Sequence, residues 1–197
     1  MVSAEALVDG KVLKVDEWEI LFRYYGLSGL VILNLSEAVA PRVDAGTVSV
    51  RINFFPGLSA DDLEEKLRDR WNRHPHRTAA CSFTGLLPDK IPPVLLPMMD
   101  VRPDLPAAGI TIEQGRRIAQ GLTAWEVKVL GSRSFTEAEV MIGGLVTDDV
   151  DPGTLESRIV PGLYFAGEML DVHGDLGGFN FQWAWSSGWS AAGGEAC

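Results

Sequence analysis

A glycine pair followed by an amide-rich helix start is the part of the sequence best suited to bind a ligand. Gly177 and Gly178 precede Asn180 and Gln182 in LGGFNFQWAWSSGWSAAG, residues 176–193. A helix N-terminus has free N–H groups and a partial positive charge, and glycine lets a flat ligand approach the backbone closely. This end therefore suits a ligand with an oxygen that becomes negative. Composition alone favours the plainer interpretation of a Gly-Gly loop followed by a core helix.

Two other glycine junctions lie upstream of that pair. In GLYFAGEMLD an apolar run ends at Gly167-Glu168, which would place a carboxylate at the end of a strand, where ligands of open α/β sheets bind. Glu168 there can accept hydrogen bonds from sugar hydroxyls. The second junction, Gly143-Gly144 in MIGG, is either a chain crossing beside a cofactor or a simple turn, and the sequence alone does not choose.

The remaining reactive residue types form no familiar site. Cys81 and Cys197 have no metal-ligand spacing, and the sequence carries neither GxSxG, nor a P-loop, nor GxGxxG after a strand. His74 and His76 flank a proline in a basic loop, and His173 is either a proton donor or a surface histidine. We therefore predict no metal site and assign no catalytic acid or base.

The charge of the chain is uneven. Of a net charge of −10, residues 136–197 hold ten acidic residues and one basic residue, whereas residues 1–135 hold seventeen and sixteen. The tail is either a solvated acidic face or a surface that contacts a partner outside this chain. No basic stripe exists to neutralise phosphates, so we expect no nucleic-acid partner. Two cysteines make no disulfide framework, so we expect a cytoplasmic protein. Glu5 and Asp9 interrupt any leader, and polar residues interrupt the tail, so we expect neither a signal peptide nor a membrane segment.

The first sixty residues favour strands. Asp9-Gly10 lies between two apolar runs and predicts a hairpin turn. VSVRINF alternates apolar and polar residues over 48–54, as strands do. In GLSGLVILNLSEAVA, Ser28 is placed to cap a short helix, although the β-branched content leaves a strand open.

Helices follow, and then strands return. Ser59 and Asp62 predict a capping box. Proline-broken short helices and a last helix in TIEQGRRIAQGL continue this part. AWEVKVLG, EAEVMIGG and LYFAGE then favour strands, with a final helix starting near Gly177. The change of composition near residue 135 is our predicted domain boundary.

The tail resembles a known flavoprotein family. AEVMIGGLVTDDVDPGTLESRIVPGLYFAGEMLDVHGDLGGFNFQWAWSSGWSAAG is similar to the C-terminal part of the BaiN/YhiN-type NAD(P)/FAD-dependent oxidoreductases. The similarity extends upstream through LFRYYGLSGLVILNLS, HPHRTAACSFTGLLP and VLGSRSFTEAEV, and so covers nearly the whole chain.

The resemblance implies an α+β fold with two parts. Residues 1–135 would be a β-barrel-like insert domain with a small helical bundle: strands over 1–58, helices over 59–122 and a return strand over 123–135. Residues 136–197 would be the C-terminal strand-helix piece of a glutathione-reductase-type FAD-binding domain. The residues that the resemblance places beside FAD are Gly143, Gly144, Gly167, Glu168, Gly177, Gly178, Asn180, Phe181 and Gln182.

The chain departs from the family pattern in three ways. Leu30 replaces a usual proline, His173 replaces a usual acid, and the N-terminal Rossmann glycine motif is missing. The implied full-length activity is hydride transfer from NAD(P)H through FAD to an unknown small-molecule acceptor, with the isolated chain inactive. The alternative is a non-catalytic binding module that does not hold FAD on its own. Exposed apolar surface left by the missing half would favour self-association.

Overall fold

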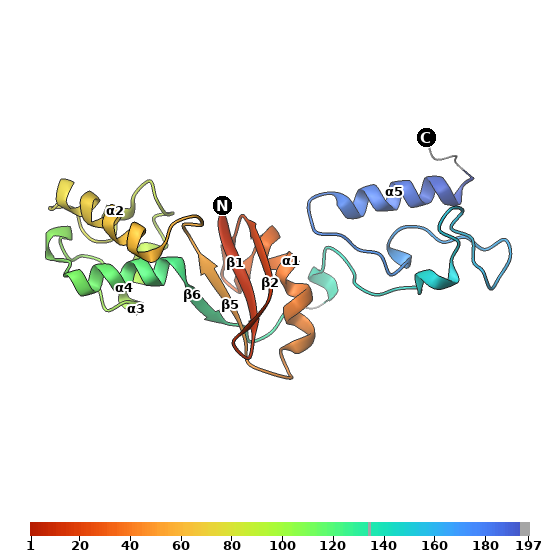
Figure 1. The fold of residues 1–197 in the computed structure, drawn as a ribbon, viewed down its shortest axis with the longest axis horizontal. Coiled ribbons are helices and arrows are strands. Elements are labelled where there is room, and N and C mark those ends of the chain that lie inside the picture. Colours follow the sequence, from red (N-terminus) through yellow and green to blue (C-terminus); the bar gives the residue numbers. More distant parts are fainter. Residues whose placement is uncertain (134, 194–197) are drawn as a thin grey trace.

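The computed structural model describes residues 1–133 and 135–193, so Ser134 and Cys197 lie outside the described residues. Figure 1 shows a central sheet with one helix against it. Three further helices lie on one side of the sheet, and a C-terminal segment with a long helix lies on the other. The class is α+β, as the sequence predicts.

The central sheet is antiparallel throughout. Its strands run in the order β2-β1-β5-β6, with bounds Val2–Val8 (β1), Lys11–Trp18 (β2), Val48–Asn53 (β5) and Trp125–Lys128 (β6). The turn between β1 and β2 confirms the predicted hairpin, because Asp9 and Gly10 both have positive φ, 50° and 76°. Such a turn twists in the same sense as the strands that it joins.

Helix α1, Leu30–Val39, covers one face of this sheet. Its buried residues Val31, Leu35 and Val39 pack in the same apolar cluster as Ala4 and Ile52, which face each other across β1 and β5. The helical interpretation of this stretch is therefore confirmed over the strand alternative. The N-cap residue of the helix is Gly29 rather than the predicted Ser28, and it makes no side-chain capping hydrogen bond.

The predicted β-barrel is wrong. Among the described residues, β2 and β6 are opposite edges of the sheet and do not pair with each other. The only other sheet there is a two-stranded hairpin of β3, Leu21–Arg23, and β4, Gly26–Ser28. Closure needs enough strands of sufficient length and stagger, whereas these strands are few and short and α1 covers one face. The alternating pattern over 48–54 correctly predicts strand β5, but such a pattern does not determine closure.

The helical part confirms the local sequence signals. Helix α2, Ala60–Arg73, begins with the predicted Ser59–Asp62 capping box and ends before Pro75. Helices α3, Pro92–Met98, and α4, Ile112–Thr123, follow, and α4 has its own capping box. Helix α2 packs on α4 through a face that includes buried Trp71, whose indole Nε1 donates to Ser82 Oγ at 3.0 Å.

The C-terminal segment contains one long helix and mostly irregular chain. Helix α5, Phe179–Ala191, starts at the glycine pair as predicted. It packs near a second apolar cluster built on buried Val150, Leu155 and Leu170. The strands predicted in EAEVMIGG and LYFAGE are not formed. LYFAGE has only an isolated bridge, Tyr164 with Glu156, and another, Leu145 with Leu170, lies just after the two stretches. Buried strands of an α/β sheet need neighbours on both sides, and this segment offers none.

Among the described residues, none of the helices is both long and apolar enough to span a membrane.

Candidate functional site

The start of α5 is an open backbone surface. Gly178 is the residue before the first turn, with φ 109°, and Gly177 has φ 126°. A Cβ placed on either glycine would meet no atom within 4 Å, so the space beside this backbone is clear. The first N–H groups of a helix have no partner within it. An anionic or strongly polar edge of a flat ligand therefore fits this end of the helix.

The two amide side chains predicted to face the ligand are engaged within the chain. The Asn180 amide forms two hydrogen bonds with the Gly174 backbone: Oδ1 accepts from its N–H at 2.9 Å, and Nδ2 donates to its carbonyl at 2.8 Å. Gln182 Nε2 donates to Ser186 Oγ at 2.9 Å. Asn180 therefore closes the loop before the helix, and Gln182 lies along the helix surface.

Gly167 lies against the other face of α5. Its N–H donates to Ser187 Oγ at 2.8 Å, and its carbonyl accepts from Trp183 Nε1 at 3.1 Å. A Cβ on Gly167 would lie 3.6 Å from that of Ala184, and φ is 65°. A Cβ there would make an ordinary van der Waals contact, so it is the positive φ rather than the close approach to α5 that favours glycine at this point.

Glu168 and Gly143 lie where the segment after Gly167 meets residues 141–143. Met141 N–H donates to Glu168 Oε1 at 2.7 Å, and Gly143 N–H donates to Asp171 Oδ1 at 3.1 Å. Glu168 belongs to a 3-10 helix, Gly167–Met169, and not to the end of a strand. One of its carboxylate oxygens therefore supports a neighbouring segment of this chain.

Gly144 lies closer to its neighbours than any other predicted site glycine. A Cβ there would lie 2.7 Å from Met169 O, 2.8 Å from Leu170 C and 2.9 Å from Asp171 N, all of them backbone atoms. Leu145 N–H donates to Met169 O at 2.9 Å, and Asp171 N–H donates to Leu145 O at 3.0 Å. The structure thus brings Gly143, Gly144, Gly167 and Glu168 together, with Gly167 also touching α5.

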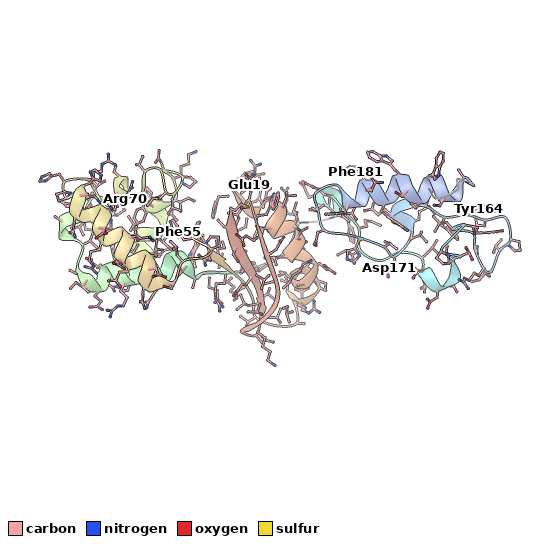
Figure 2. All side chains as sticks on the ribbon, turned by 45° about the horizontal axis from the view of Figure 1, so that its top comes forward. Glu19, Phe55, Arg70, Tyr164, Asp171 and Phe181 are labelled. Carbon is pink, nitrogen blue, oxygen red and sulfur yellow. The ribbon has the colours of Figure 1, made fainter. Side chains whose placement is uncertain are left out.

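Phe181 belongs to an exposed aromatic face of α5. Phe181 and Trp185 are 71% and 70% exposed, and their rings stack with centroids 6.4 Å apart. Phe179 and Trp189 are also mostly exposed, and Figure 2 shows Phe181 on the side of α5 away from the Asp171 segment. An apolar surface of this kind typically marks a contact with another protein segment.

Sequence reasoning missed three residues that organise this region: Ser187, Asp171 and Asn34. Ser187 is buried, and it accepts from Gly167 while donating to the Trp183 carbonyl at 2.6 Å. Asn34 accepts a hydrogen bond from Leu176 N–H at 2.8 Å, although 142 residues separate them. Only Asp171 carried a signal in the sequence, as an acid three residues after the Gly167-Glu168 junction. A serine in a helix or an asparagine in α1 carries none.

A cleft of about 250 Å³ lies elsewhere, between α2 and the chain before it. Its apolar walls include Phe55 and Leu67, and Arg70 lies at its rim. Figure 2 shows Phe55 and Arg70 in the helical part, at the opposite end of the molecule from Phe181. Among the described residues, no group of three or more His, Cys, Asp or Glu side chains is placed to hold a metal ion.

A family match covers most of the chain. Residues 21–194 match the model described as the HI0933-like protein Rossmann domain. The chain belongs to the HI0933-like family. This confirms the family resemblance drawn from the sequence.

Curated relatives of this HI0933-like chain include two kinds of enzyme. A 3-dehydro-bile acid delta(4,6)-reductase of Clostridium scindens is 33% identical over 187 residues, covering 94% of this chain and 46% of the relative. Ribosomal RNA dihydrouridine synthases of Escherichia coli and Haemophilus influenzae are 36% and 33% identical, each covering 88% of this chain and 41% of the relative. The chain thus spans less than half the length of these relatives.

The backbone of the HI0933-like chain fits a flavin in one respect. The space beside Gly177 and Gly178 is open at the positive end of α5, so a flat, electron-accepting ring can approach this backbone closely. The amides of Asn180 and Gln182 are used inside the chain, so the backbone rather than these side chains provides the fit.

Proposed function

We propose that this chain is part of a flavin-dependent oxidoreductase, in which it supplies one wall of the FAD site. The single observation that supports this best is the open, positively polarised start of α5 at Gly177 and Gly178, in a chain of the HI0933-like Rossmann family. A reductase among the relatives supports the same class of reaction. When bound, FAD would supply the redox chemistry.

The residues of this chain would bind and orient that cofactor. The N–H groups at the start of α5 would stabilise negative charge on the reduced ring. The Gly143-Gly144 segment, fixed by Glu168 and Asp171, would form the adjacent wall. We assign no proton donor to this site.

The substrates belong to the proposal. NAD(P)H would reduce the flavin, and the relatives' names suggest an acceptor with a carbon–carbon double bond, because both a delta(4,6)-reductase and a dihydrouridine synthase are named for adding hydrogen to one. We favour a small-molecule acceptor, since a net charge of −10 opposes binding to a polyanion. RNA is the specific alternative, and salt-dependent binding of an RNA hairpin would support it.

The exposed aromatic face of α5 also belongs to this proposal. We expect the rest of the family's Rossmann domain to cover Phe181, Trp185 and Trp189. More than half of each relative's length lies outside the part that matches this chain, which is enough to supply such a cover. Where that part is lacking, the same face favours self-association of the chain. Light scattering at increasing concentration would report such association.

The test is the visible absorption spectrum of the purified chain, before and after excess FAD is added and unbound FAD is removed. We expect retained flavin in the wild type and its loss in Gly178→Glu, which puts a charged side chain into the open space beside the glycine pair. Gly193→Glu is the matched control, because Gly193 also has positive φ and open space but lies after the end of α5. A wild type that holds no flavin would favour the alternative, a binding module that does not hold FAD on its own.

A further inference from the structure

The loop that leads into the glycine pair is attached to the central sheet and its helix. Leu176 N–H donates to Asn34 Oδ1 on α1 at 2.8 Å. The other end of the same amide, Asn34 Nδ2, donates to Asp16 Oδ2 on β2 at 2.8 Å. Because Asn34 is bonded at both ends, its side chain has a defined orientation, and it links β2 to a residue directly before Gly177.

Charged residues reinforce the same attachment. Lys14 Nζ on β2 lies 3.0 Å from Glu37 Oε2 on α1 and 3.3 Å from Asp175 Oδ1 in the loop. The second oxygen of Glu37 lies 3.2 Å from His173 Nε2. Two charged side chains of the sheet and helix thus contact two side chains of the loop.

We propose that Asn34, Lys14 and Glu37 are positioning residues, which hold the loop 173–176 and so fix where the flavin-facing glycine pair lies. We call these three residues, together with their contacts to the loop, the tether. The importance of the tether for the cofactor rests on the proposed function, whereas its effect on the loop does not.

The glycines make such a tether necessary. Gly177 and Gly178 have no side chains to pack, and glycine has more backbone freedom to lose than any other residue. A binding edge built on them is well placed only if the chain beside them is fixed. Asn180 fixes the loop to the start of α5 through Gly174, and the tether fixes the loop to the sheet.

The tether also accounts for His173, which replaces the acid that the family resemblance leads one to expect. A carboxylate at this position would lie beside Glu37, and like charges at hydrogen-bonding distance repel. An imidazole nitrogen instead forms a hydrogen bond with Glu37. The histidine is therefore matched to the glutamate on α1.

The tether is expected to weaken in acid. Hydrogen bonds from Lys14 and then His173 lower the pKa of Glu37 below its ordinary 4.5, so the stabilisation is complete above pH 4.5 and is lost as the pH falls through the lowered value. Burial alone would lower the pKa of Lys14, but hydrogen bonds to Glu37 and Asp175 raise it above 10.5. The contribution of Lys14 is therefore lost only above pH 10.5.

Amide hydrogen exchange of the loop 173–176 at several pH values, corrected for the pH dependence of the intrinsic exchange rate, would measure the pH range in which the tether holds. The acid-side loss of protection should shrink in Glu37→Gln, which has no carboxylate to protonate. Asp16, Lys14, Asp175 and His173 are the other titratable groups at the tether. An acid-side loss as large in Glu37→Gln as in the wild type would contradict the assignment to Glu37.

A charge swap tests the tether directly. Asn34→Asp keeps an acceptor for Leu176 N–H but places a carboxylate against Asp16. Adding Asp16→Asn restores a donor–acceptor pair with the original net charge. We expect exchange over 173–178 to become about tenfold faster in Asn34→Asp and to return to the wild-type rate in the double variant. Asn72→Asp, the same change on an exposed position of α2, is the control.

Exchange in β1 and β5 serves as the internal reference, and FAD binding is measured in parallel. Faster exchange of the loop alone, with rescue by the double variant, supports the tether even in a chain that holds no FAD. Where the chain holds FAD, the dissociation constant of FAD should rise in Asn34→Asp and return to the wild-type value in the double variant, as the exchange of the loop does. Unchanged loop exchange in Asn34→Asp, equal acceleration in β1 and β5, or failure of the double variant to rescue would overturn the proposal.

Discussion

Gly144→Ala is expected to separate the 141–145 segment from the 168–171 segment. The added Cβ would lie under 3 Å from three backbone atoms, which are unable to rotate away as a side chain would. The cost is about 1–3 kcal/mol of local stability, the usual range for overpacking. Faster exchange of the Leu145 and Asp171 amides would show it, because both are held by hydrogen bonds across this contact.

The same variant should reduce FAD retention if the proposed site is correct, since the Gly143-Gly144 wall would move. Gly188→Ala is the control, because a Cβ at Gly188 would meet nothing within 4 Å and alanine favours the interior of a helix by about 0.5–1 kcal/mol. If Gly144→Ala leaves the exchange of Leu145 and Asp171 unchanged, the close approach described for Gly144 is wrong.

Trp71→Ala is expected to have the largest effect on the stability of the helical part. Trp71 is only 4% exposed, lies between α2 and α4, and would be 3.2 Å from a Cβ on Gly115. Truncating such a residue leaves a cavity and costs about 3–5 kcal/mol. Urea denaturation followed by far-ultraviolet circular dichroism, which reports helix content, would measure the loss.

Two further variants separate the causes. Trp71→Phe keeps most of the packing but loses the hydrogen bond to Ser82 Oγ. The lost hydrogen bond should lower the free energy of unfolding by about 1 kcal/mol, in addition to the small loss of packing. Trp185→Ala removes an exposed indole and should cost about 1 kcal/mol or less. Equal losses for Trp71→Ala and Trp185→Ala would contradict the assignment of Trp71 to the core.

Local features of the fold could be predicted from the sequence because neighbouring residues determine them. The Asp9-Gly10 turn follows from the positive φ that glycine tolerates. The Ser59–Asp62 capping box follows from two side chains one helical turn apart. The start of α5 at the glycine pair is of the same kind.

Features that depend on distant partners could not be predicted. Whether the sheet closes depends on which strands lie beside β2 and β6, and the residues of β2 and β6 do not indicate their neighbours. The strands expected in EAEVMIGG and LYFAGE lack the neighbours that would complete a sheet. Similarly, no sequence pattern indicates that Asn34 contacts Leu176, so in the sequence Asn34 looks like any other polar residue of a helix.

The two apolar clusters share no side chain, and this determines how mutational effects combine. The larger one includes Trp71 and the sheet, whereas the smaller one is built on Val150, Leu155 and Leu170. Cooperativity passes between parts of a chain through shared packing, so the two clusters need not melt together, and one free energy of unfolding does not describe both. Trp71→Ala and Gly144→Ala should accordingly act independently, so that each lowers the stability of its own transition by the same amount in the double variant as alone.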